Sequence, residues 1–151
     1  MDQDAFRQTY QQVNERYCAY EKAILTHQCN CSQARKLNIA EREATHCAND
    51  NAQVLCIQYL DALKKQARFA LKLTTSTGVL PHGKAIKIQV GGLRGLQQVL
   101  HSELEPTAPI KDVSALIADA ISTYAEIENL PFSRIMQQVA AYQGRKRVSK
   151  R

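Results

Sequence analysis

Apolar residues recur at intervals of three and four along most of this chain, which is the spacing of one face of an α-helix. The clearest stripe lies between about residues 52 and 73, and its seam consists of Cys56, Leu60, Leu63, Ala67 and Ala70. Similar stripes follow Asp4, Asp112 and Pro131, residue types that commonly begin a helix. Only six Gly and four Pro interrupt these patterns. The periodicity predicts a mainly α-helical fold.

The expected elements form a helical bundle of four to five principal helices. Helices are expected over residues 5–24, 39–48, 52–73, 92–104, 112–127 and 131–143, some of them short, with a loop over 26–38. Between them Ile86, Ile88 and Val90 alternate with polar residues, the pattern of a half-buried strand, and Gly91 and Gly92 would end it. The fold class is therefore mainly α, with one short extended segment near 85–90.

A length of 151 residues favours one domain. We expect a helical domain over 1–143 and a disordered basic tail over 144–151, because the last seven residues supply five of the six net positive charges. No apolar run is long enough to span a membrane. The first four residues, Met1-Asp2-Gln3-Asp4, do not resemble a secretory signal. A cytoplasmic location is therefore expected, with no membrane partner.

Five cysteines, the complete set, lie within 39 residues: Cys18, Cys29, Cys31, Cys47 and Cys56. Free cysteines that serve only as small apolar residues would be scattered through all the helices. Disulfides are disfavoured by the odd number and by the expected reducing compartment. Zinc usually takes Cys-x2–4-Cys pairs, whereas here ten, one, fifteen and eight residues intervene, although His27 and His46 could complete a mixed set. Metal-free thiols, reactive or structural, are a further alternative.

An iron–sulfur cluster, of the 4Fe-4S type, is the hypothesis we favour, because it needs four thiolates and tolerates irregular spacing. The expected ligands are Cys29, Cys31, Cys47 and Cys56. Cys18 is the expected spare, although an exchange of Cys18 for one of the two loop cysteines stays open. The spacing differs from ferredoxin, rubredoxin and zinc-finger patterns.

Charge is segregated along the chain, since residues 62–102 contain seven Lys or Arg and no Asp or Glu. This basic stretch predicts a docking surface for an acidic protein partner, and nucleic acid is a less favoured partner because no recognition motif accompanies it. No catalytic constellation is present, which favours a protein that is not an enzyme. The expected role is electron transfer, redox sensing or that of a small accessory subunit. The alternatives are a zinc-stabilised or metal-free module that binds protein or nucleic acid, and a thiol redox sensor.

Overall fold

The computed structural model describes residues 16–39, 41–70 and 81–143. Its elements follow the chain as α2 (Glu21–Leu25), β1 (Ala34–Ile39), β2 (Arg42–Cys47), α3 (Asp50–Ala70), α4 (His82–Leu100), α5 (Val113–Tyr124), the 3-10 helix η1 (Ile127–Asn129) and α6 (Phe132–Ala141). The predicted mainly helical fold with a short extended part is confirmed. In the described part of the chain no helix is long and apolar enough to cross a membrane.

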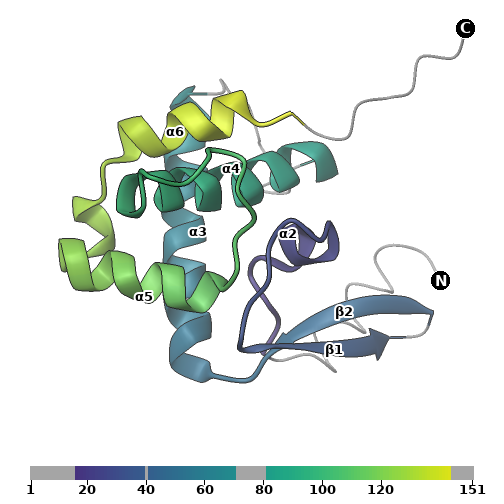
Figure 1. Cartoon of the computed structure of the whole chain (residues 1–151). Helices are drawn as coiled ribbons and strands as arrows, with labels where there is room; N and C mark the ends of the chain where they lie inside the picture. The colour runs from purple at the N-terminus through teal and green to yellow at the C-terminus, as the bar shows by residue number, and fades with distance from the viewer. Residues whose placement is uncertain (1–15, 40, 71–80, 144–151) are drawn as a thin grey trace, which may run out of the picture.

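Helix α4 lies at the centre of the helical body and contacts α2, α3, α5 and α6 (Figure 1). Its closest neighbour is α6, which it meets through glycines. A β-carbon on Gly91 would lie 2.6 Å from the Cα of Val139, and one on Gly95 would lie 2.7 Å from the carbonyl oxygen of Ile135. The absence of side chains at these two positions therefore lets the two helix backbones approach closely.

The predicted strand over 85–90 is wrong, because these residues lie inside α4. Residues 88–93 are all buried, so the helix is covered on nearly every side in its middle. A helix buried all round loses the one-sided apolar stripe that identifies it in a sequence. The alternation of apolar and polar residues that predicted a strand arises because Lys87 and Gln89 separate the apolar residues. Gln89 is itself buried, so the alternation does not mark an exposed face.

The extended structure is instead an antiparallel hairpin of β1 and β2, in which Leu37 pairs with Ala44. This corrects the helix predicted over 39–48. The N-terminal segment adds a short third edge, since the Cys18 N–H donates to the Thr45 carbonyl (3.0 Å) and the Cys47 N–H donates to the Arg16 carbonyl (2.7 Å). Strand β2 thus has backbone partners on both sides, which a marginal ten-residue helix would not match.

The long helix predicted over 5–24 is shortened in the described residues. Tyr17 forms a β-bridge with His46, and only Glu21–Leu25 are helical, whereas residues 1–15 lie outside the described part. The other helices agree better with prediction. Helix α3 buries Cys56, Leu60, Leu63 and Ala67 of the expected seam, and α5 begins at the expected cap, Asp112. The basic tail and residues 71–80 fall outside the description.

Candidate metal centre

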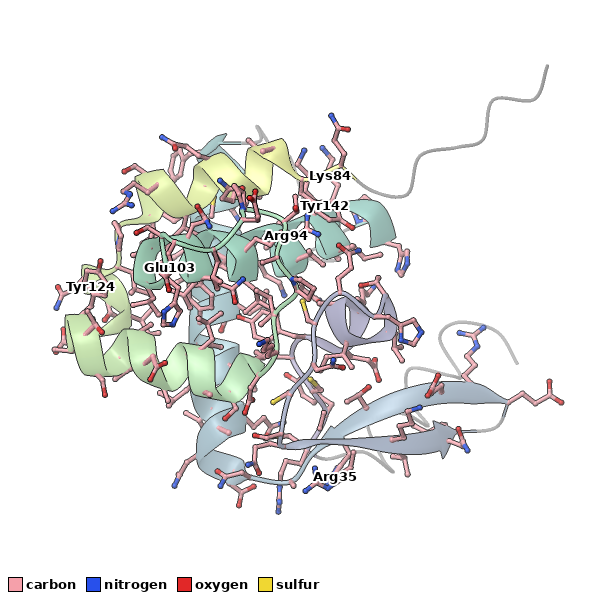
Figure 2. The ribbon with its side chains drawn as sticks, in the orientation of Figure 1. Arg35, Lys84, Arg94, Glu103, Tyr124 and Tyr142 are labelled. Carbon is pink, nitrogen blue, oxygen red and sulfur yellow. The ribbon has the colours of Figure 1, made fainter. Side chains whose placement is uncertain are left out.

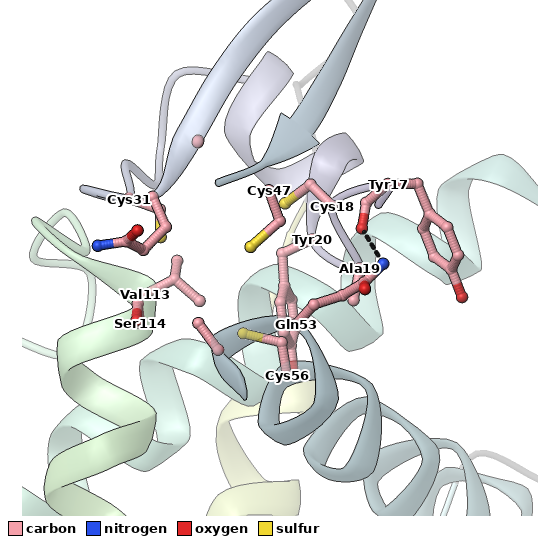
Figure 3. Close-up of a pocket in the computed structure, with 13 residues that line it drawn as sticks. Tyr17, Cys18, Ala19, Tyr20, Cys31, Cys47, Gln53, Cys56, Val113 and Ser114 are labelled. Atoms are coloured by element: carbon pink, nitrogen blue, oxygen red, sulfur yellow. Dashed lines mark hydrogen bonds between the residues drawn. The ribbon is translucent and has the colours of Figure 1, made fainter. Parts of the chain in front are cut away.

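Four of the five cysteines line one pocket between the hairpin and the helical body. Cys18 comes from the segment before α2, Cys31 from the loop before β1, Cys47 from the end of β2, and Cys56 from the second turn of α3. Figure 3 shows their sulfurs directed toward the space between them. Four separate parts of the chain therefore contribute thiols to one pocket, and the rest of the lining is largely apolar.

Cys29 does not line this pocket. It is fully buried on the other side of its loop, where it forms a parallel β-bridge with Ile110. Residues i and i+2 of a regular strand point to the same face, so the separation of Cys29 from Cys31 shows that the loop turns between them. Of the predicted ligand set, the structure brings together Cys31, Cys47 and Cys56, and it adds Cys18 in place of Cys29.

The loop that carries Cys31 is fastened to the start of α5 by backbone hydrogen bonds. The Asn30 N–H donates to the Ile110 carbonyl (2.8 Å), and the Val113 N–H donates to the Asn30 carbonyl (2.9 Å). Asp112 adds a side-chain link, because its carboxylate accepts from the Ser32 N–H at 3.1 Å while it also caps α5. These bonds fix the position of Cys31 relative to the helix.

Burial disfavours the thiolate form of three of the pocket cysteines. Desolvation raises the pKa of Cys18 from 9.0 to about 12, and it also raises the pKa of Cys31 and of Cys56. Each thiolate formed would further oppose ionisation of its neighbours, since the pKa of Cys56 is also raised by Cys18, Cys31 and Cys47. Reactive cysteines have lowered pKa values and some exposure, so this arrangement argues against a thiol sensor at this site.

Backbone N–H groups offset part of this effect at two sulfurs. A hydrogen bond from the backbone of Tyr20 opposes the rise in the pKa of Cys18, which burial dominates. At Cys31 burial again dominates and the net pKa is raised, while backbone hydrogen bonds from Gln33 and Ser114 oppose part of that rise. Ser114 belongs to the first turn of α5, whose N–H groups have no partner within the helix. The pocket thus supplies donors for thiolate sulfur.

The Cys47 Sγ–H donates a hydrogen bond to the carbonyl oxygen of Asn49 at 3.2 Å. A carbonyl oxygen only accepts hydrogen bonds, so the sulfur is the donor in this contact. Neither of the two histidines considered as ligands, His27 and His46, lines the pocket. Within residues 16–39, 41–70 and 81–143, no three or more Cys, His, Asp or Glu side chains are gathered around a point that could hold one metal ion.

The sequence contained signals for Cys31, Cys47 and Cys56 but not for the residues that support them. Asp112 could be identified only as a helix cap, because its contact with Ser32 joins positions 80 residues apart. Tyr20 lines the pocket beside Cys18, and no sequence pattern separates it from an ordinary buried tyrosine. Comparisons of the chain with protein-family models, curated proteins and solved structures found no match.

Proposed function

We propose that the protein binds an iron–sulfur cluster, of the 4Fe-4S type, through Cys18, Cys31, Cys47 and Cys56. The observation that supports this proposal is the convergence of four thiols, from four separate segments, on one apolar pocket. Four cysteine thiolates are the usual ligand set of such a cluster. An apolar surrounding shields it from solvent, and solvent exposure is one of the factors that set its reduction potential.

Two features favour a cluster over zinc. The pocket cysteines are far apart in sequence and form no Cys-x2–4-Cys pair. Backbone donors also approach Cys18 and Cys31, and hydrogen bonds to sulfur tune cluster potentials.

Binding a cluster requires the pocket to open. The cavity measures about 10 Å³, which is close to the space needed by one water molecule. The helices α3 and α5 form one wall and are anchored in the core, whereas the hairpin and the Cys31 loop form the other wall. We therefore expect the hairpin side to move outward on binding, with release of the Cys47 contact to Asn49.

The pocket fits a role in electron transfer, redox sensing or support of a larger assembly as a small accessory subunit. None of these roles needs a substrate-processing group beside the cluster. The raised thiol pKa values mean that ligation must displace protons, so cluster or metal binding becomes tighter as pH rises.

The test is anaerobic purification or reconstitution, followed by a visible spectrum and by iron, acid-labile sulfide and zinc analysis. Serine variants of Cys18, Cys31, Cys47 and Cys56 should each lose iron and sulfide. The matched control is Cys29→Ser, which changes a fully buried cysteine outside the pocket and should retain the cluster. A loss in Cys29→Ser with retention in Cys18→Ser would instead restore the ligand set that the sequence suggested.

Two other results would replace the proposal. One zinc per chain in a colourless protein would indicate a structural zinc site in a binding module. Absence of both metals after reconstitution would leave a metal-free helical module, and specific oxidation of one thiol under mild oxidant would then support a thiol sensor.

We also propose that the basic stretch docks an acidic protein partner, at a groove between α2, α4 and the end of α6. The groove encloses about 950 Å³, and Gln28, Lys87 and Tyr142 are among its lining residues. Helix α4 contains no Asp or Glu. Arg94 donates to the Gln28 side chain at 2.7 Å and lies over the Tyr142 ring, and it belongs to none of the ion pairs between described residues.

Figure 2 shows Lys84, Arg94 and Tyr142 on the same side of the body. The half-buried guanidinium of Arg94 could pair with a carboxylate that an acidic partner supplies. Titration with a glutamate-rich peptide, followed by NMR, should perturb this groove, and Lys87→Glu should abolish the effect. Arg134→Glu, on the exposed side of α6, is the control. Binding of nucleic acid with a steep salt dependence would favour the other partner class.

A further inference from the structure

Tyr20 contains an unusual polar atom. Its side chain is completely buried, and its hydroxyl is the buried side-chain polar atom, among the described residues, that has no hydrogen-bond partner. Tyr59 provides a contrast, because it is equally buried and its hydroxyl donates to the Gly92 carbonyl at 2.7 Å. Buried tyrosines normally find such a partner. The unpaired hydroxyl of Tyr20 therefore needs an explanation.

The position of Tyr20 connects it with the four-cysteine pocket. It follows Cys18 by two residues and lines the pocket wall. Its ring extends toward α3 beside Cys56 in Figure 3. Among the pocket thiols labelled there, Cys56 is the one that the ring lies beside.

Helix α2 holds Tyr20 in place. The Ala23 N–H, in the first turn of α2, donates to the side-chain oxygen of Gln89 at 3.1 Å in the buried interface with α4. Glu21 accepts from the Thr45 N–H of β2. With the helix fixed on both sides, the tyrosine ring cannot simply turn out to solvent to satisfy its hydroxyl.

The chemistry of Cys56 explains how the hydroxyl could gain a partner. As a buried thiol, Cys56 is only a weak acceptor. Ligation to iron makes it a thiolate, and hydrogen bonds to an anionic acceptor are roughly twice as strong as neutral ones. The same change that fills the pocket thus creates the acceptor that Tyr20 lacks.

We propose that the Tyr20 hydroxyl donates a hydrogen bond to the Cys56 thiolate when the cluster is bound, an inference that rests on the proposed function. The bond stabilises the more negative, reduced cluster over the oxidised one and so raises its reduction potential. In the cluster-free protein the same hydroxyl is unpaired and lowers stability.

The experiment compares Tyr20→Phe with Tyr59→Phe, each of which removes one oxygen atom from a fully buried ring. In the cluster-free protein, urea unfolding should show Tyr20→Phe more stable than the wild type and Tyr59→Phe less stable. In the reconstituted protein, Tyr20→Phe should favour the oxidised cluster about tenfold, equivalent to a midpoint potential about 59 mV lower for a one-electron couple. Tyr59→Phe should leave the potential unchanged.

The outcomes separate this inference from the function on which it rests. If wild type and Tyr20→Phe bind clusters of equal potential, the hydrogen bond is refuted while cluster binding stands. If the wild type binds no cluster, the proposed function fails, and the inference fails with it. A lower potential in both Phe variants would also refute the inference, because the effect would then come from general loosening of the core.

Discussion

Replacement of Asp112 by Ala tests whether the Cys31 loop is held on the helical body as described. The carboxylate accepts hydrogen bonds from Ala115 (3.4 Å), as the cap of α5, and from Ser32 (3.1 Å), in the loop. Loss of a helix cap costs about 1 kcal/mol, and loss of a further hydrogen bond at a partly exposed site costs about 1 kcal/mol. Asp112→Ala should therefore lower the free energy of unfolding by about 2 kcal/mol.

Urea unfolding of the cluster-free protein, followed by far-UV circular dichroism, measures this difference. Asp119→Ala is the control, because Asp119 is an exposed carboxylate on the same helix, and it should change stability by less than about 0.5 kcal/mol. Asp112→Asn should retain most of the cap, since Asn is as good a capping residue as Asp. Equal stabilities of Asp112→Ala and Asp119→Ala would refute the proposed fastening of the loop.

The pH dependence of the same difference provides a second check. Burial would raise the pKa of Asp112, but hydrogen bonds from Ser32, Ala115 and Cys31 lower it below its ordinary value of 3.8. A carboxyl group with a lowered folded-state pKa stabilises the protein above its unfolded pKa, and this contribution disappears as pH falls through the folded pKa. The difference between wild type and Asp112→Ala should thus be full at neutral pH and should shrink in strong acid, below 3.8.

Three further predictions concern the thiols and the central helix. At mildly alkaline pH, iodoacetamide should alkylate Cys18 and Cys29 about a thousandfold more slowly in the folded than in the urea-unfolded protein, because burial raises both pKa values from 9.0 to about 12; mass spectrometry gives the rates. Gly95→Ala should lower stability by about 1–3 kcal/mol through a clash with the backbone of α6, whereas Gly83→Ala, where space is open, should raise it by about 0.5–1 kcal/mol; thermal unfolding of the pair measures both. Gln89→Leu should cost about 1–3 kcal/mol, because it leaves a buried N–H of α2 without an acceptor; urea unfolding against the wild type checks this value.

The helices that cover one face of the core could be predicted from the sequence, and the elements covered on both sides could not. Helix α3 is exposed on one side, so its buried residues Cys56, Leu60 and Leu63 repeat with the helical period. Helix α4 is buried around its middle, which erases that period. Strand β2 buries Ala44 and Cys47, three residues apart, because the N-terminal segment and α3 cover it in addition to β1. That spacing imitates a helix.

The cysteine site shows the same limit at the level of single residues. Clustering within 39 residues was sufficient to select the region, but the choice between Cys18 and Cys29 depended on long-range pairing. Cys18 reaches the pocket because its backbone pairs with Thr45 of β2. Cys29 is drawn away because its backbone pairs with Ile110, 81 residues further along the chain. Neither pairing has a local signature in the sequence.

The four-cysteine pocket lies where the hairpin and the segment before α2 both meet helix α3. The hairpin contacts the helical body at β2 and α3, next to Cys47 and Cys56, while the segment before α2 reaches α3 through the Gln53 side chain, which donates to the Tyr17 carbonyl at 2.9 Å. A ligand that binds only the folded pocket stabilises every segment needed to form it, in proportion to its affinity and concentration. Cluster binding should therefore slow hydrogen exchange at the Cys18 and Cys47 amides, which pair the N-terminal segment with β2, far more than at the buried amides of α4. Equal protection of both regions with and without the cluster would show that the hairpin is held by its own packing and that the pocket contributes nothing to its order.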